Sequence, residues 1–172
     1  MANNISKLYI IGNGFELGSV NLNGADNVTL KEIVFDAANA VQGYDGSGKA
    51  KQNANIITGD TNKPKKGAHN LVIDGCTFEG TFANGGAAIA FTDQNRISGW
   101  SGNVTIMNCT FNTEGGYYDI YGYYTGNKNK FEIKNNTFKS ETQSKSIYLG
   151  RYASSTPVVV KDNTFKTKTS LD

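Results

Sequence analysis

One apolar signature recurs six times along this chain of 172 residues. Each instance begins with a hydrophobic residue, which we number offset 0, and has a second hydrophobic residue at offset +2. A residue expected to point inward follows at offset +5, and a phenylalanine at offset +7. Six of the nine phenylalanines occupy this last offset, so the pattern is an internal repeat. The instances are Leu8-Ile10-Asn13-Phe15, Val28-Leu30-Ile33-Phe35, Leu71-Ile73-Cys76-Phe78, Val104-Ile106-Cys109-Phe111, Phe131-Ile133-Asn136-Phe138 and Val158-Val160-Asn163-Phe165.

The offsets predict two short strands joined by a sharp corner. Residues two apart on a strand point to the same face, so offsets 0 and +2 form one strand and offsets +5 and +7 form another. The interval of three between them requires a bend, which Gly, Asn and Asp accommodate because they tolerate left-handed backbone angles. Every residue at offset +4 except Glu32 is of these types: Gly12, Glu32, Gly75, Asn108, Asn135 and Asp162.

Repeated strand pairs with a long return segment predict the coils of a solenoid. The intervals between repeats are 20, 43, 33, 27 and 27 residues, which indicates a constant coil with loop insertions. The return segments of the later repeats contain a further strand-like run, at Ala88 to Thr92, Asp119 to Tyr123 and Ser146 to Leu149. The sequence therefore predicts an all-β, single-domain solenoid of about six coils, with three short strands in each coil.

Two segments, Val104 to Phe111 and Phe131 to Phe138, resemble the coils of the right-handed parallel β-helix in the pectin-lyase-like superfamily. The resemblance covers about residues 8 to 167 and implies a right-handed parallel β-helix. It does not imply one activity, since that superfamily includes lyases, hydrolases, adhesins and phage tailspikes.

Stacked coils would place equivalent residues in columns about 4.8 Å apart. The phenylalanines would form one column and the threonines at offset +6 another, while the inward +5 column changes from cysteine to asparagine. Stacked Asn side chains can hydrogen-bond to one another and so need not be unsatisfied. The separation of Cys76 and Cys109 would permit a disulfide, but neighbouring buried thiols are commonly unbridged, and we favour free thiols.

The chain divides into a solenoid and three less regular parts. Residues 1–7 are expected to form an N-terminal cap or arm, and 167–172 a polar C-terminal tail, because apolar positions cease there. Residues 43–69, rich in Gly, Asn, Lys and Asp, are predicted to be an insertion loop of the second coil.

Charge and hydropathy exclude several partner classes. The net charge of +2, with scattered lysines, argues against a nucleic-acid partner. No stretch is long and apolar enough to predict a membrane span. The first apolar run, before Gly12, is also too short for a signal peptide, so we expect no general secretory export of the chain as written unless a leader has been trimmed.

The repeat does not predict a catalytic, metal or cofactor site. In the outward columns at offsets +1 and +3, no two acidic residues occupy neighbouring coils. The Asn-Thr-Asp, Asp-Asp, Gly-His-Gly and Arg-Ile-Lys segments of the resembled hydrolases are absent. His69 is the single histidine, and no second His or Cys accompanies it as a metal ligand. We therefore expect a non-enzymatic protein without cofactors.

Aromatic residues form the one candidate contact surface. Aligning Ile120 with Ile147 as inward residues places Tyr121 on Tyr148 at the outer face. Such a strip could contact a sugar ring or a neighbouring subunit, or its rings could simply cover the sheet beneath a loop. The candidate residues are Tyr118, Tyr121, Tyr123, Tyr148, Tyr152 and Trp100.

The leading hypothesis is a structural component of a bacteriophage virion: a capsid decoration, head-fibre or tail protein. Its partners would be other virion subunits or copies of itself, because the end coils of a solenoid have unpaired edges. The alternative is an extracellular or cell-surface module that binds carbohydrate or acts as an adhesin. A polysaccharide lyase or hydrolase is the least favoured hypothesis.

Overall fold

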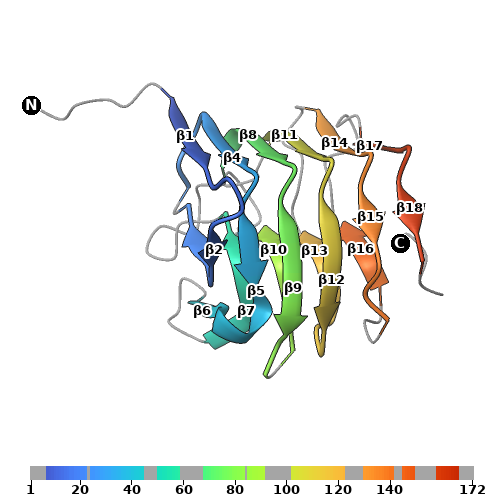
Figure 1. Cartoon of the computed structure of the whole chain (residues 1–172). Helices are drawn as coiled ribbons and strands as arrows, with labels where there is room; N and C mark the ends of the chain where they lie inside the picture. Colours follow the sequence, from blue (N-terminus) through green and yellow to red (C-terminus); the bar gives the residue numbers. More distant parts are fainter. Residues whose placement is uncertain are drawn as a thin grey trace, which may run out of the picture.

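The chain winds as a parallel β-helix (Figure 1). The computed structural model describes residues 7–22, 24–44, 50–58, 68–83, 85–91, 102–122, 130–141, 145–149 and 158–166. Successive coils follow one another from the blue end of the molecule to the red end, and their strands build three sheets. Apart from one turn of 3-10 helix, η1 (Ala37–Asn39), the elements assigned in these ranges are strands. The prediction of an all-β solenoid with three strands per coil is confirmed.

The first sheet contains the strands predicted at offsets 0 and +2. Each strand pairs in parallel with the next, and equivalent offsets lie opposite each other, as Val104 lies opposite Phe131. The inward residues of the inner coils, such as Leu30 and Ile106, are fully buried. The strands are β1 (Leu8–Ile11), β4 (Val28–Lys31), β8 (His69–Asp74), β11 (Gly102–Met107), β14 (Phe131–Lys134) and β17 (Val158–Lys161).

The second sheet contains the strands that follow each corner. Thr110 lies opposite Thr77 and Thr137, and the same register places the phenylalanines of neighbouring coils side by side. The predicted threonine and phenylalanine columns are therefore confirmed for these coils. The strands are β2 (Glu16–Leu17), β5 (Val34–Asp36), β9 (Thr77–Thr81), β12 (Thr110–Glu114), β15 (Thr137–Phe138) and β18 (Thr164–Phe165).

The third sheet contains the strands of the return segments. Its strands are β3 (Val20–Asn21), β7 (Ala50–Ile57), β10 (Gly86–Phe91), β13 (Tyr118–Gly122) and β16 (Lys145–Leu149), and they pair in parallel. A further strand, β6 (Val41–Tyr44), pairs antiparallel to β7. The three return strands predicted from sequence correspond to β10, β13 and β16.

The prediction of an insertion loop over 43–69 is wrong for the residues of β7. This strand lies between β3 and β10, and its Ile56 is fully buried opposite Ile89. This strand was not predicted because η1 and β6 lie between β5 and β7. Ile56 therefore follows the phenylalanine of its coil at a much greater distance along the sequence than Ile120 and Ile147 follow theirs. Residues 45–49 and 59–67 lie outside the described residues.

The first coil departs from the predicted repeat after its first strand. Leu17, not Phe15, lies opposite Phe35, and Phe15 is exposed. The corner of this coil contains two consecutive residues with positive φ, Asn13 (47°) and Gly14 (81°). The corner of each later coil contains one such residue, at offset +4. The longer corner shifts the second strand by two residues, so the assignment of Phe15 to the phenylalanine column was wrong.

The remaining corners adopt left-handed backbone angles at offset +4, as predicted. Gly75, Asn108, Asn135 and Asp162 have φ between 55° and 63°. Glu32, whose side chain does not favour this region, nevertheless has φ 54°. The fold of the coil therefore imposes the corner even where the residue type does not favour it.

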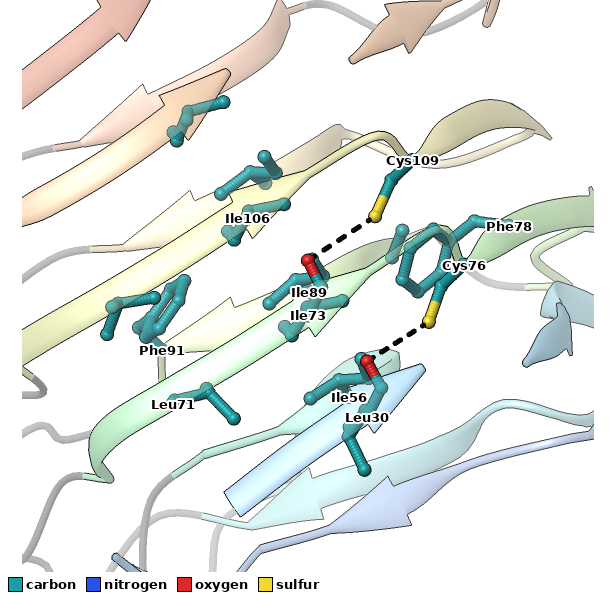
Figure 2. Close-up of a cluster of buried hydrophobic side chains, with 14 of the residues drawn as sticks. Leu30, Ile56, Leu71, Ile73, Cys76, Phe78, Ile89, Phe91, Ile106 and Cys109 are labelled. Atoms are coloured by element: carbon teal, nitrogen blue, oxygen red, sulfur yellow. Dashed lines mark hydrogen bonds between the residues drawn. The ribbon is translucent and has the colours of Figure 1, made fainter. Parts of the chain in front are cut away.

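The core is built around a column of stacked phenylalanine rings. Phe35, Phe78, Phe111, Phe138 and Phe165 succeed one another with centroids 4.8 to 5.1 Å apart and nearly parallel planes. Aliphatic side chains of the first and third sheets, including Ile73 and Ile89, pack beside this column (Figure 2). Each buried side chain of this size stabilises the folded state by about 1.5 to 3 kcal/mol relative to an exposed one.

Cys76 and Cys109 are buried free thiols at equivalent positions of neighbouring coils. Their sulfur atoms lie 3.7 Å from the carbonyl oxygens of Leu30 and Ile73, respectively, each in the preceding coil (Figure 2). Burial raises the pKa of Cys109 well above the ordinary value of a thiol. The favoured prediction of unbridged thiols agrees with this arrangement.

The predicted terminal arm and tail fall almost entirely outside the described residues, which omit 1–6 and 167–172. In the part of the chain that is described, no helix has the length and hydrophobicity needed to cross a membrane.

Candidate functional site

Three tyrosine rings gather on the outer face of the third sheet. Tyr121 and Tyr148 lie opposite each other in β13 and β16, with ring centroids 5.6 Å apart and planes within 10° of parallel. Tyr118 lies 5.1 Å from the ring of Tyr121 and 5.4 Å from that of Tyr148. We call these three residues the tyrosine cluster.

Local alternation along the strands places the cluster on the outside. Ile120 and Ile147 are fully buried in the core, so Tyr121 and Tyr148, the next residue in each strand, point away from it. On the two preceding coils the column continues as Ala90 and Ile57, both of which are buried. Among the described residues of the third sheet, this column is therefore aromatic only in the fourth and fifth coils.

The predicted stacking of Tyr121 on Tyr148 is confirmed, but the rings are only half-exposed. Tyr121 and Tyr148 cover one face of each other, which leaves at most one face of each ring for a ligand. A sugar that stacks on an aromatic residue needs such a face. Tyr123, Tyr152 and Trp100, the other predicted members of this surface, lie outside the described residues.

Two acidic residues, Asp74 and Glu132, lie in the outward columns of the first sheet. Asp74 and Glu132 belong to the third and fifth coils, separated by the fourth. The carboxylate of Asp74 accepts a 2.7 Å hydrogen bond from the side-chain amide of Asn108. The two acids therefore do not form the neighbouring pair that carboxylate catalysis uses.

Glu132 is instead the centre of a charge cluster. Its carboxylate lies 3.1 Å from the ammonium of Lys134, 3.2 Å from that of Lys130 and 3.9 Å from that of Lys161. The hydrogen bond from Lys134 is the main cause that lowers the pKa of Glu132. Sequence analysis missed this cluster, although the register that aligns Lys134 with Lys161 signals it.

A second feature that sequence analysis missed is an exposed asparagine ladder at the N-terminal ends of the first-sheet strands. Asn27, Asn70 and Asn103 all have positive φ, and the side-chain amide of each later residue donates to the side-chain oxygen of the one before. The signal was present at offset −1 of these repeats. Because its groups bond to each other, the ladder has a structural role at the corner.

The N-terminal coil exposes several large apolar side chains close together in the sequence. Leu8 is 39 % exposed, Tyr9 61 %, Ile11 56 % and Phe15 65 %. β1 is the terminal strand of the first sheet in the described residues, so one of its edges has no described neighbour. At the opposite end β17 terminates the same sheet, and Phe165 of β18 is 38 % exposed.

No protein-family model, curated protein or solved structure matches this chain. The fold is therefore assigned from the arrangement of its own strands, which is compatible with a parallel β-helix.

Proposed function

We propose that this protein is a non-enzymatic structural protein that works within an assembly, and that the assembly is a bacteriophage virion, where it serves as a capsid decoration, head-fibre or tail component. We further propose that its fold is related to that of the pectin-lyase-like superfamily. The three-sheet coil and the segments Val104 to Phe111 and Phe131 to Phe138 support that relationship.

The observation that carries the proposal is the open N-terminal coil. Tyr9, Ile11 and Phe15 are all more than half exposed there, next to the edge of β1 that has no neighbour among the described residues. An unpaired edge with apolar side chains readily pairs with another chain unless something covers it. A subunit of a regular particle meets such neighbours by symmetry, which makes a virion a suitable setting.

The engagement of the acidic side chains supports a non-enzymatic role. Asp74 is bonded to Asn108, and Glu132 is held by lysines on both its own and the following coil. A general acid would instead need a raised pKa, whereas that of Glu132 is lowered. Incubation with uronate polymers and calcium should release no unsaturated sugars, measured by their ultraviolet absorbance.

The assembly role is tested by light scattering and by particle binding. We expect the purified full chain to form an oligomer, or to sediment with phage particles that lack their own copy. A protein that remains monomeric at high concentration and has no affinity for particles would contradict the proposal. A capsid or portal gene beside the coding sequence would support the virion setting directly.

The tyrosine cluster favours a second candidate, an extracellular glycan-binding or adhesin module. Its three rings lie within 5.6 Å of one another and are partly exposed. Binding to a glycan array that is lost in Tyr121→Ala and Tyr148→Ala would support this candidate. Tyr117→Ala, at an exposed tyrosine outside the cluster, is the matched control and should leave binding unchanged.

A further inference from the structure

We propose that the two open ends of the solenoid bind each other: a second copy of this chain stacks head to tail on the first, and its β1 pairs in parallel with β17. This inference rests on the proposed assembly role and names the partner that covers the ends. It concerns the first and second sheets, which in the part of the chain that the structure describes terminate at β1 and β2 on one side and at β17 and β18 on the other.

The backbone groups of β1 are directed so that half of them face away from the molecule. The N–H groups of Leu8 and Gly12 donate to carbonyl oxygens of the second coil, over 3.0 and 2.8 Å. Alternate residues of a parallel strand bond to the same neighbour, so the N–H and C=O groups of Tyr9 and Ile11 face the open side. A strand that bonds there must supply donors and acceptors at matching intervals.

At the other end of the molecule, β17 supplies backbone N–H donors and C=O acceptors that face outward. The N–H of Val104 donates to the carbonyl of Lys130, which precedes the strand of the following coil, over 3.0 Å. Val158 and Val160 occupy the equivalent offsets of the last first-sheet strand, so their N–H and C=O groups face beyond it. The edge of β17 in one copy is therefore complementary to the edge of β1 in another.

The side chains at the two ends also match. In the register of the molecule's own coils, Leu8 and Ile10 would lie opposite Val158 and Val160 of the other copy, which extends the inward apolar column. Leu17, which takes the phenylalanine position of the first coil, would meet the exposed ring of Phe165. The new interface thus repeats the chemistry by which adjacent coils of one molecule hold each other.

A head-to-tail contact is heterologous, so each bound copy leaves one new end open and the series continues. This distinguishes it from an isologous pair of two N-terminal coils, which would stop at a dimer. It also differs from coverage of the ends by a segment of the same chain, which would leave a monomer.

Two variants block the ends separately. Tyr9→Lys with Ile11→Lys places two charges beside the edge of β1, at outward positions that are already exposed. Val159→Lys with Thr164→Lys does the same at the last coil, in the outward columns of β17 and β18. Lysines at an edge oppose strand addition. The matched control is Thr29→Lys with Thr105→Lys, which adds the same charge to strands whose two edges are both paired.

Light scattering over a range of concentrations, with circular dichroism as the check of folding, tests the proposal. The wild type and the control should show an average mass that rises with concentration. Each end variant alone should be monomeric, and an equimolar mixture of the two should give a dimer of twice that mass, because one intact β1 edge then meets one intact β17 edge.

The other outcomes overturn the inference in distinguishable ways. If only the β1 variant is monomeric, the contact is isologous. If both variants assemble as the wild type does, another surface is responsible and the assembly role stands without this interface. A wild type that is monomeric at every concentration contradicts head-to-tail stacking, and particle binding then decides whether the assembly role survives.

Discussion

The side-chain amide nitrogen of Asn136 lies 3.0 Å from the side-chain oxygen of Asn163 in the next coil, and it also donates to the carbonyl of Ile106 in the preceding coil over 3.1 Å. Its own oxygen accepts the backbone N–H of Cys109 over 2.9 Å. Asn163 holds the fifth coil in the same way, since it bonds to the N–H of Asn136 and to the carbonyl of Ile133. Each inward asparagine therefore fastens its coil to the one before.

Replacement of Asn136 by alanine should lower the free energy of unfolding by about 2 to 4 kcal/mol, because buried polar groups of the preceding coil lose their partner and a small cavity forms. Asn112→Ala, at an exposed position of β12, should change stability by no more than about 0.5 kcal/mol. Denaturant unfolding followed by circular dichroism measures both. Equal effects of the two substitutions would show that the buried amide contributes nothing particular.

Cys109 occupies the same column but holds the preceding coil only weakly. Its sulfur lies 3.7 Å from the carbonyl of Ile73, the equivalent of the carbonyl that Asn136 binds. Cys109→Asn is nearly volume-conserving and would replace a weak thiol donor by an amide, so we expect stability to rise by about 1 kcal/mol. A fall in the unfolding midpoint would mean that the column cannot accept a third asparagine. Cys109→Ala is the control that removes the thiol without supplying an amide, and it should destabilise.

The sequence predicted the regular part of this fold because the coil repeats its geometry at fixed intervals. Phe111 and Phe138 are 27 residues apart, and the register that aligns them follows from that interval alone. β7 was missed because extra elements displace Ile56 from its expected spacing. Phe15 was misplaced because spacing alone cannot show that the first corner contains two left-handed residues.

The candidate surfaces were predictable only in part. The stacking of Tyr121 on Tyr148 followed from the alignment of two isoleucines. The spacing of the repeat aligns Lys134 with Lys161. The ion pairs of these lysines and Lys130 with Glu132 depend in addition on side-chain reach, which spacing does not give.

Leu8 has the same place in the repeat as the buried Val28 and is exposed because no described coil lies beyond it. Tyr9 and Ile11 are exposed because they occupy outward positions of the strand.

Glu32 offers a test of the backbone strain at the corners. It adopts φ 54°, a region that costs most L-residues about 1 to 2 kcal/mol but is easier for asparagine. Its ion pair with Lys31 is exposed on both sides and contributes little. Glu32→Asn should therefore raise the free energy of unfolding by about 0.5 to 1 kcal/mol, measured by thermal or denaturant unfolding. Glu79→Asn, at an exposed position in β9 without positive φ, should give no such gain.

The stability of the protein should fall at alkaline pH because of Cys109. Its pKa is raised mainly by burial, so the folded thiol keeps its proton at a pH where the thiol of the unfolded chain, with a pKa of about 8.5, has lost it. The unfolded state then binds fewer protons than the folded state, and the free energy of unfolding decreases as pH rises. The stability that depends on protonated Cys109 is fully present below about pH 8. Above the pKa of the thiol in the unfolded chain, the free energy of unfolding falls by up to about 1.4 kcal/mol per pH unit. The hydrogen bond with Cys109 is the main cause that lowers the pKa of Cys76, so the comparison variant removes both thiols, Cys76→Ala with Cys109→Asn. Denaturant unfolding between about pH 8 and 10 should show a steeper loss for the wild type than for this variant. Parallel curves for the two proteins would mean that the two thiols together titrate alike in the folded and unfolded states.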